Sequence, residues 1–534
     1  MNFSSHQIAI FNFIENDSRS VIVDAKAGSG KTTSIVEATR RLDSNLAVLF
    51  LAFNKSIVNE LNDRLPSGVK CSTFNAIGYG AWRRYTGRKY IKIESDKIRK
   101  IIRDNFTNDD FTLYSSFCGK MVALAKSAGL RPDDSYQDWS ALSIHHSLIL
   151  DSDKAEYPRA IELSKKILDY SIKIAYDICD FDDQIYMPWL TGASFDKYDV
   201  VFVDEAQDTN KIQAELISRM IGDNGRIIAV GDPGQAIYGF RGADSAAMNN
   251  IADTFGAVTL PLSISYRCSK SIIAEAQKYV PEIEAFSGAD NGTVEQVSKY
   301  TIDSFNSSDA ILCRNVAPLI EIAYQIISRG KKINFVGRDL ASGLKSLIEK
   351  MKAENVNDLS VKLDEWLSKE SKRLIEKDQE SKIEIVADRV QCIETFIEYL
   401  PMGKERISDL LNAIDFLFKT DDSGITLTSV HKSKGREWNR VFILGFAKYM
   451  PSKYAKSEWQ MQQERNLIYV AITRARKCLY YICENEWADE PNMRIDESAY
   501  SSHAKNASQV KSLDSSRYPA KNNEHMAAFI SRFN

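Results

Sequence analysis

The chain has 534 residues, of which 44% are hydrophobic and 26% charged, and its formal net charge is −3. This length predicts more than one domain, and the composition excludes the disordered and fibrous classes. No stretch approaches the roughly 18 consecutive apolar residues of a membrane helix, and the first residues (MNFSSHQIAIFNFIEND) lack the basic start and apolar core of a signal peptide. The slightly negative charge argues against a surface that binds nucleic acid everywhere, but it permits a local basic channel.

Short apolar strands alternate with helical patterns in two blocks of the chain, as in parallel α/β sheets. In the first block the predicted strands span residues 21–25, 47–53, 69–74, 200–204 and 226–231. In the second block they span residues 258–264, 310–314, 332–336, 425–430, 440–445 and 478–483. The expected fold class is therefore α/β, with two parallel-sheet domains.

Each block is interrupted by a segment with helical periodicity and mixed charge. Runs dense in Lys and Glu, such as residues 369–382, are typical of solvated helix faces. The polar end of the chain predicts a flexible tail. We therefore expect a first sheet domain at 1–80 and 181–255, a helical insertion at 81–180, a second sheet domain at 256–340 and 424–495, a second helical insertion at 341–423, and a tail at 496–534.

A glycine-rich turn with the sequence AKAGSGKTT at 25–33 follows the first predicted strand and leads into a helix. Glycines let the backbone curl so that its N–H groups surround phosphates, and the N-terminus of the helix adds positive potential. In such a phosphate loop Lys31 reaches the β and γ phosphates, and Thr32 places its hydroxyl on Mg²⁺. A plain glycine-rich turn is the alternative, but the intact GKT between a strand and a helix favours the phosphate loop. The predicted nucleotide-binding residues are Ala25, Lys26, Ala27, Gly28, Ser29, Gly30, Lys31, Thr32 and Thr33.

Two adjacent carboxylates end the apolar strand in VVFVDEAQD at 200–208. The carboxyl edge of a parallel sheet is where ligands bind. Asp204 is suited to hold Mg²⁺, directly or through water, and Glu205 is suited to accept a proton from an attacking water. Acidic pairs also occur as loop decoration, but the phosphate loop upstream favours catalysis. Together the two segments predict an NTPase that uses ATP and Mg²⁺, with Thr32 and Asp204 as metal ligands.

Further segments carry a family resemblance. The longer ones are GDPGQAIYGFRGA at 231–243, SYR at 265–267, SVHKSKGREW at 429–438 and ERNLIYVAITRA at 464–475. The shorter ones are LAFNK at 51–55, STFN at 72–75 and DFDD at 180–183. In this order, from residue 7 to about residue 476, the chain resembles the UvrD/Rep/PcrA branch of superfamily 1 helicases. The resemblance implies two RecA-like motor domains with two helical insertions, and an ATP-driven motor on single-stranded nucleic acid.

The resemblance assigns further residues to the nucleotide. Gln7 matches the glutamine that reads adenine, Tyr266 flanks the base, and Glu437 lies on the ribose. Three more residues act at the γ-phosphate. Gln235 senses it, Arg267 contacts it from the second domain, and Arg474, on the last helix of the second block, is an arginine finger. Such a finger is worth about 10³–10⁵ in rate. The expected catalytic set is Lys31, Thr32, Asp204, Glu205, Gln235, Arg267 and Arg474.

The same resemblance identifies residues that contact the strand. Tyr238 and Phe240 present rings to the bases, and stacking of this kind is worth about 1–3 kcal/mol per base whatever the sequence. A place in the core is the commoner fate of aromatic residues, but the surrounding Gly, Asp and Arg favour a loop here. The predicted strand-contacting residues are Phe53, Asn54, Lys55, Thr73, Asn75, Tyr238, Phe240, Arg314 and His431.

A motor mechanism follows from this assignment. The phosphate loop and the carboxylates are expected on one domain and both arginines on the other, so ATP favours closure and hydrolysis favours opening. The resemblance implies 3′→5′ travel on single-stranded DNA, unwinding of tailed duplex DNA and a monomer. It leaves open whether the pathway is DNA repair, replication restart, recombination or phage biology, with repair or replication proteins as candidate partners. The expected location is cytoplasmic and nucleoid-associated.

Several positions depart from the family pattern. Asn75 stands where many relatives have His, Asn466 where many have a second Arg, Thr33 where Arg is frequent, and Arg436 where Leu is usual. The asparagine after Arg314 stands one place earlier than in many relatives. These changes bear on base preference and strand binding rather than on hydrolysis. The second insertion is short, which questions strong autonomous unwinding. No nuclease segment accompanies the motor, so no strand cleavage is expected.

Two other functions fit the same residues. The first is an RNA-directed motor, because the motifs do not exclude contacts to a 2′-hydroxyl. The second is an ATP-gated clamp that binds DNA within a repair or defence assembly. Unwinding of a tailed duplex separates a motor from a clamp, and competition between matched DNA and RNA separates the two motors.

Overall fold

The computed structural model describes residues 3–52, 54–146, 148, 150, 154–237, 239, 246–297, 302–376, 380–401, 403–419 and 423–482. The chain divides into two compact units. Unit 1 comprises residues 1–289 and 457–469, and unit 2 comprises residues 290–456 and 470–534. None of the described helices is long and apolar enough to cross a membrane.

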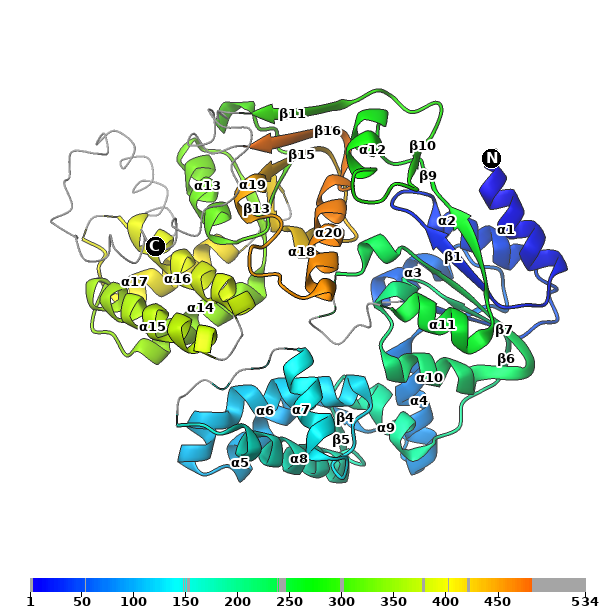
Figure 1. The fold of residues 1–534 in the computed structure, drawn as a ribbon, viewed down its shortest axis with the longest axis horizontal. Coiled ribbons are helices and arrows are strands. Elements are labelled where there is room, and N and C mark those ends of the chain that lie inside the picture. The colour runs from blue at the N-terminus through cyan, green and yellow to red at the C-terminus, as the bar shows by residue number, and fades with distance from the viewer. Residues whose placement is uncertain are drawn as a thin grey trace. The chain divides into compact units, whose positions relative to one another are not determined.

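Unit 1 is built on a six-stranded sheet whose described pairings are all parallel (Figure 1). Its strand order is β3 (Lys70–Thr73), β2 (Val48–Ala52), β6 (Tyr198–Val203), β7 (Ile221–Gly231), β1 (Val21–Ala25) and β8 (Val258–Leu262). The inner strands are runs of Val, Ile, Leu and Phe, which suit strands that are buried on both faces. Parallel pairing brings the carboxyl ends of these strands to one edge, so the loops that follow them lie along that edge.

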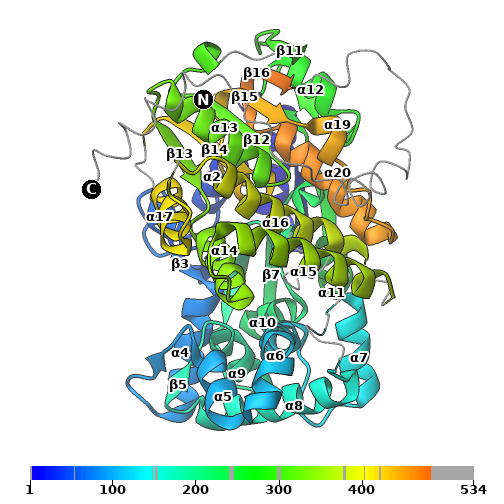
Figure 2. The same ribbon diagram turned by 90° about the vertical axis from the view of Figure 1, so that its left-hand side faces the viewer.

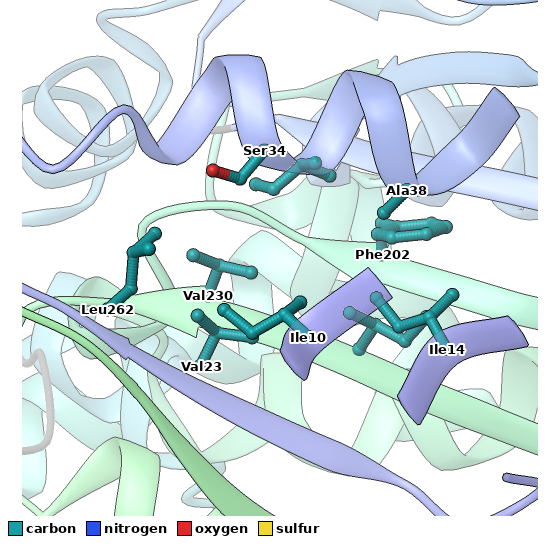
Figure 3. A pocket seen from close by; sticks show the side chains of 10 residues that line it. Ile10, Ile14, Val23, Ser34, Ala38, Phe202, Val230 and Leu262 are labelled. Atoms are coloured by element: carbon teal, nitrogen blue, oxygen red, sulfur yellow. The ribbon is translucent and has the colours of Figure 1, made fainter. Parts of the chain in front are cut away.

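Three helices pack on one face of this sheet, and one of them, α3 (Lys55–Asn62), buries Leu61 in the same cluster as Phe50 and Phe202 of the strands. Side chains of α1 (Ser5–Asn16) and α2 (Lys31–Arg40) contact Val23, Phe202 and Val230 of the strands (Figure 3). A cavity of about 10 Å³ remains between them, and its lining is apolar apart from Ser34. A space of this size holds at most one water molecule. It is therefore a gap in core packing and not a nucleotide site.

The opposite face of the sheet joins the core of a helical insertion. Ile22, Leu49 and Val201 belong to the same buried cluster as Trp82 and Phe117 of the insertion. The helices on this side and in the insertion are α4 (Phe74–Thr86), α5 (Lys97–Asn105), α6 (Asn108–Ala128), α7 (Tyr136–His145), α8 (Tyr157–Ile174), α9 (Asp183–Thr191), α10 (Lys211–Met220) and α11 (Ala247–Phe255). Two short strands, β4 (Lys92–Ile93) and β5 (Ile178–Cys179), pair in parallel within it.

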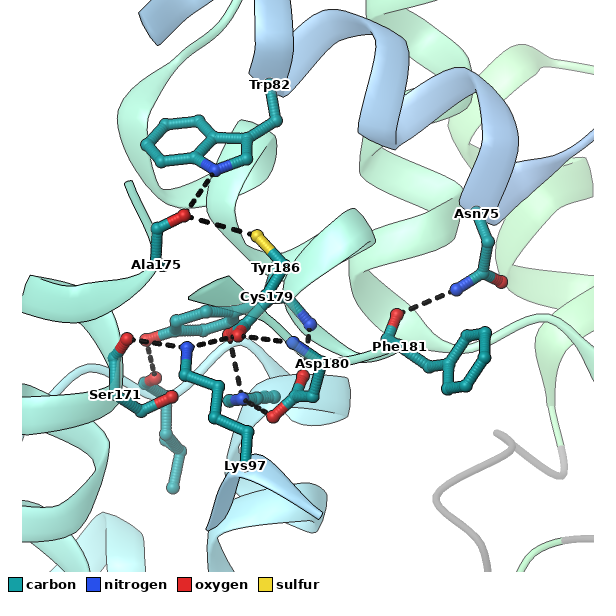
Figure 4. Close-up of polar contacts among 12 residues, drawn as sticks. Asn75, Trp82, Lys97, Ser171, Ala175, Cys179, Asp180, Phe181 and Tyr186 are labelled. Carbon is teal, nitrogen blue, oxygen red and sulfur yellow. Dashed lines mark hydrogen bonds and ion pairs between the residues drawn. The ribbon is translucent and has the colours of Figure 1, made fainter. Parts of the chain in front are cut away.

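A buried network of charges lies where the insertion returns to the sheet (Figure 4). The Lys97 ammonium donates to Asp183 at 2.5 Å and to the Ser171 carbonyl at 2.8 Å. Lys126 pairs with Asp180 at 2.6 Å and with Asp183 at 2.7 Å. Both lysines are only 1% exposed. Because buried charges are tolerated only when paired, these contacts fix α5 and α6 against the returning chain.

Unit 2 contains a second parallel sheet of six strands. Their order is β11 (Thr293–Val297), β16 (Ala475–Ile482), β15 (Trp438–Leu444), β12 (Ala310–Cys313), β14 (Ile425–Ser429) and β13 (Ile333–Val336). Figure 2 shows α14 to α17 gathered as one helical group between β13 and β14 in the chain. The helices of this unit are α13 (Ala317–Ser328), α14 (Arg338–Met351), α15 (Val356–Glu376), α16 (Ile383–Glu398), α17 (Ile407–Phe418), α18 (Val430–Ser433) and α19 (Phe446–Tyr449). The helix α20 (Glu458–Ile472) begins in unit 1 and ends in unit 2.

The structure corrects one strand assignment and adds strands that were not predicted, of which β4, β5 and β10 (Glu284–Ala285) are short and β11 belongs to a six-stranded sheet. The strand expected at 258–264 in the second block is β8, which pairs with β1 (Val21↔Val258) and completes the sheet of unit 1. Apolar strands of both blocks have the same character, so the pattern identified a strand but not its partner. β11 was not predicted. It is a short edge strand with the half-exposed sequence TVEQV, which gives little periodic signal.

Candidate nucleotide site and strand-contacting residues

The phosphate loop connects β1 to α2 and is shaped by two glycines. Gly28 has φ +75° and Gly30 has φ +81°, both in the left-handed region that favours glycine. The Lys26 N–H donates to the Leu262 carbonyl at 3.0 Å, and the Ser29 N–H donates to the Lys26 carbonyl at 3.1 Å. α2 begins at Lys31 immediately after this curl. The first N–H groups of a helix have no partners within the helix, so the loop and the helix together form an anion cradle.

A second segment is locked onto the loop at Gly28. The Tyr266 N–H donates to the Gly28 carbonyl at 2.8 Å. A Cβ atom at position 28 would lie 2.4 Å from the Arg267 Cβ and 2.6 Å from the Ser265 Oγ. Only glycine permits this approach. Arg267 therefore belongs to unit 1, beside the phosphate loop, and the expectation that it lies on the other domain is wrong.

The two carboxylates after β6 lie at the loop's lysine. The Lys31 ammonium is 3.0 Å from Glu205 Oε1, and the Glu205 N–H donates to Asp204 Oδ1 at 2.9 Å. Glu205 adopts φ +50°, a left-handed conformation that is rare outside glycine. Strain of this kind is typical of functional turns. The structure thus brings Lys31, Asp204 and Glu205 together, as the sequence predicted.

Electrostatics at this cluster favour a cation. Burial and then the neighbouring Glu205 carboxylate raise the pKa of Asp204, Lys31 lowers it, and the net value is about 7. Burial lowers the pKa of Lys31, but the carboxylates of Glu205, Asp204 and Asp232 outweigh it and the pKa lies above its ordinary value. Two crowded carboxylates repel one another, so a divalent cation beside them lowers the energy of the ionised pair.

A hydrogen-bond chain that sequence reasoning missed begins at Glu205. The Gln207 amide donates to Glu205 Oε2 at 2.5 Å and accepts from the Asp232 N–H at 3.0 Å. Gly231 makes room for it, because a Cβ there would lie 2.3 Å from Gln207 Oε1. Gln207 therefore links the Glu205 carboxylate to the turn that follows β7.

The same chain continues from Asp232 to the phosphate loop. Asp232 accepts from the Gln235 amide at 2.7 Å and from the Tyr469 hydroxyl at 3.1 Å. That hydroxyl in turn accepts from the Ala27 N–H at 2.9 Å. Burial raises the pKa of Tyr469 well above its ordinary value, so the hydroxyl keeps its proton and acts as both donor and acceptor. Gln235, predicted to sense the γ-phosphate, is thus bonded to the aspartate through which this path connects Glu205 with the phosphate loop.

Asn466 holds the turn that carries Gln235. Its amide donates to the carbonyls of Pro233 at 3.1 Å and Ala236 at 2.9 Å. This position departs from the family's arginine. The asparagine is short enough to bond the turn directly, so the departure has a structural role within unit 1.

The donor set fits a magnesium nucleotide. The Ser29 and Ser265 hydroxyls are buried beside the loop and have no hydrogen-bond partner among the described residues. Such groups are costly unless a ligand satisfies them. Lys31 and the loop N–H groups suit phosphates, and Thr32 with Asp204 offers the oxygen ligands that Mg²⁺ takes.

Gln7 lies next to this cradle but is partly engaged. Its amide nitrogen donates to Ser34 Oγ at 2.9 Å, and its oxygen accepts from the Ser4 N–H at 2.9 Å, which caps α1. Each amide atom retains capacity for one more hydrogen bond. Adenine reading by Gln7 stays a prediction.

Unit 2 holds the remaining predicted nucleotide contacts. Arg474 follows α20 in the turn before β16, not on the helix as expected, and its guanidinium donates to the carbonyls of Val470 at 2.9 Å and Arg436 at 3.0 Å. Glu437 pairs with Arg476 at 2.7 Å. These contacts hold the Arg474 and Glu437 side chains in place.

Comparison with known proteins agrees with this geometry. The profile of the UvrD/REP helicase N-terminal domain matches residues 9–256, and that of the UvrD-like helicase C-terminal domain matches residues 424–482. Together these matches cover more than half of the chain. The chain belongs to the UvrD/REP helicase family.

Similar proteins of this helicase family share long stretches with the chain. F-box DNA helicase protein 1 of Schizosaccharomyces pombe is 26% identical over 86% of this chain and 55% of its own length. F-box DNA helicase 1 of Gallus gallus is 25% identical over 86% of the chain and 47% of its own length. The ATP-dependent DNA helicase PcrA of Staphylococcus aureus is 22% identical over 86% of the chain and 80% of its own length. The chain spans about half the length of the F-box relatives.

The unit 1 segments predicted to contact the nucleic-acid strand lie at the carboxyl ends of β2 and β3. Asn54 and Thr73 cap α3 and α4, with their side-chain oxygens accepting from backbone N–H groups at 3.0 and 3.2 Å. Lys55 is exposed. The Asn75 amide donates to the Phe181 carbonyl at 2.7 Å, which ties STFN to DFDD (Figure 4). These residues share one sheet edge, while Phe53, Tyr238 and Phe240 lie outside the described residues.

The two strand residues predicted in unit 2 have different surroundings. Arg314 is mostly buried and pairs with Glu384 of α16 at 3.0 Å. His431 lies in the short helix α18 after β14 and is half-buried. Arg314 is thus engaged in joining β12 to the helical group, and strand binding by it requires release from Glu384.

Proposed function

We propose that the chain is an ATP-driven motor that moves 3′→5′ along single-stranded DNA and unwinds tailed duplex DNA. The observation that supports it most is the cluster of Lys31, Asp204 and Glu205 at a phosphate loop whose glycines adopt left-handed φ. Family membership and the DNA helicase names of its relatives support DNA as the track. The chain would use ATP with Mg²⁺.

The residues of the cluster divide the chemistry among them. Thr32 and Asp204 would hold Mg²⁺, which supplies charge neutralisation at the phosphates. Lys31 would leave Glu205 to bind the β and γ phosphates. Glu205, released from Lys31, would accept a proton from the attacking water while Gln207 keeps its carboxylate oriented. The ion pair therefore withholds the base until Lys31 has a phosphate to bind.

Further residues complete the proposal. Tyr266 would flank the base, Glu437 would bind the ribose, and Arg267, from unit 1, would act at the γ-phosphate. Arg474, from unit 2, would act as an arginine finger, so that hydrolysis requires both units and cycles of closure and opening drive travel. Stacking of bases on Tyr238 and Phe240 would hold the strand.

The test measures ATP hydrolysis with and without single-stranded DNA. We expect strong stimulation by DNA in the wild type and loss of hydrolysis in Lys31→Ala. Glu205→Gln should still bind ATP but hydrolyse it at least about a hundredfold more slowly. Lys120→Ala, an exposed lysine of α6, is the matched control and should hydrolyse ATP normally.

Tailed duplexes then separate the functions. Unwinding of a 3′-tailed but not a 5′-tailed duplex supports the proposed direction. Hydrolysis that DNA stimulates without any unwinding or travel supports a clamp instead. Preference for RNA over matched DNA in competition replaces the DNA motor with an RNA motor. Rapid hydrolysis indifferent to either strand contradicts the motor proposal altogether.

A further inference from the structure

Two aromatic rings stand side by side and exposed next to the phosphate loop. Tyr266 is 43% exposed and Phe286 is 41% exposed. Their centroids lie 5.0 Å apart with an angle of 39° between the ring planes. Large aromatic side chains ordinarily bury most of their area. A pair that leaves both rings open to solvent has apolar surface available for a ligand.

Paired backbone segments bring the two rings together. β9 (Ile264–Ser265) pairs in parallel with β10 (Glu284–Ala285), and the Phe286 N–H extends the pairing by donating to the Ser265 carbonyl at 3.1 Å. The adjacent Tyr266 N–H donates to Gly28 of the phosphate loop. Backbone hydrogen bonds therefore connect the phosphate cradle with the segment that carries Phe286.

Gly288 lets the Phe286 ring occupy its position. A Cβ at residue 288 would lie 2.7 Å from Phe286 Cε1 and 3.2 Å from its Cζ, so the ring covers bare backbone there. The Ala289 N–H donates to the Phe286 carbonyl at 2.9 Å and closes the turn. The ring is thus held between Tyr266 and the backbone of Gly288.

We propose that Phe286 is a positioning residue for the nucleobase of ATP. It holds the Tyr266 ring in one orientation and extends the apolar surface on which the base stacks. This inference rests on the proposed ATP-dependent function and deepens its account of the base. A stacking ring that is already oriented loses less freedom when the base binds, which strengthens binding. The contribution of a well-placed aromatic pair corresponds to about a threefold to tenfold change in affinity.

The experiment compares a ligand that has a base with one that lacks it, using the full chain. The KM for ATP and the inhibition constant of inorganic tripolyphosphate are measured for the wild type, Phe286→Ala, Phe286→Tyr and Gly288→Ala. We expect Phe286→Ala to raise the KM about threefold to tenfold with little change in kcat and no change in the tripolyphosphate constant. Phe286→Tyr should restore the wild-type KM. Gly288→Ala should raise the KM because its methyl group displaces the ring.

Controls keep the outcome interpretable. Tyr170→Ala removes a ring of similar exposure from α8, away from the loop, and should leave both constants unchanged. A parallel rise of the KM and the tripolyphosphate constant in Phe286→Ala overturns the proposal, because the ring then supports the loop and not the base. An unchanged KM overturns it as well. If wild type and Lys31→Ala hydrolyse ATP equally, the proposed function itself fails, which is a separate outcome.

Discussion

The Tyr469 hydroxyl offers a direct test of the path between the phosphate loop and the turn after β7. Tyr469→Phe keeps the ring and removes the bond from the Ala27 N–H at 2.9 Å and the bond to Asp232 at 3.1 Å. The first is a neutral bond worth about 0.5–1.5 kcal/mol, and the second involves a carboxylate and is worth about 1.5–3 kcal/mol. The free energy of unfolding should therefore fall by about 2–4.5 kcal/mol.

Part of this lost free energy should appear as a lower kcat/KM for ATP. Without the hydroxyl the Ala27 N–H has lost its acceptor, and the phosphate loop is less ordered before ATP binds. If about 1 kcal/mol of the loss concerns that ordering, kcat/KM for ATP falls about fivefold, and at 1.4 kcal/mol it falls about tenfold. Steady-state hydrolysis at several ATP concentrations measures this ratio, and thermal unfolding measures the stability.

Tyr186→Phe is the matched control. Tyr186 is also fully buried in unit 1, and its hydroxyl donates to the Leu130 carbonyl at 2.7 Å within the helical insertion. Its loss should cost about 1 kcal/mol of stability and leave kcat/KM unchanged. Equal kcat/KM in Tyr469→Phe and wild type would refute the reasoning. An equal decrease in both variants would refute it too, because the effect would then follow stability and not the path.

The remaining predictions concern packing and charge. Lys126→Ala leaves two buried aspartates without this partner and should destabilise the protein by about 3–5 kcal/mol, whereas exposed Lys120→Ala on the same helix should change the unfolding midpoint little. Gly78→Ala places a methyl group 2.0 Å from a backbone oxygen of α9 and should lower the free energy of unfolding by more than about 1 kcal/mol. Gly343→Ala on α14 places its methyl group in open space and should raise the free energy of unfolding by about 0.5–1 kcal/mol. Thermal unfolding of the four variants checks these signs. Gly231→Ala should displace the glutamine that joins the base to the turn and lower kcat, and an unaltered kcat would contradict that link.

The parts of the site that the sequence predicted are local. The phosphate loop needs only a strand, two glycines, a lysine and a helix start within one short segment, so AKAGSGKT specifies its own shape. The same holds for Asp204 and Glu205 at the end of a buried strand. Their meeting with Lys31 follows from a parallel sheet, in which strand ends share an edge.

What the sequence did not reveal depends on pairing over long distances. β8 has the same apolar character as any inner strand, so nothing in it distinguishes a place beside β1 from a place in the other sheet. Because Arg267 follows this strand, it was assigned to the wrong domain as well. The Tyr469 hydroxyl bonds a loop 442 positions away, and a buried tyrosine within an apolar helix pattern does not identify its partner. Gln207 was within the recognised motif, but only the fold shows which groups its amide joins.

The charges at the root of the helical insertion have a mechanical consequence. The insertion leaves the sheet of unit 1 through α4 and returns at Asp180 and Asp183, where buried Lys126 pairs with both aspartates and buried Lys97 pairs with Asp183. The short hydrogen bonds of a buried ion pair weaken over a small displacement, and full separation leaves buried charges without partners at a cost of about 3–5 kcal/mol. A force applied to the insertion should therefore be transmitted to the strands of the sheet through this network. A force large enough to break these ion pairs should separate the insertion from the sheet in one step rather than bend it gradually.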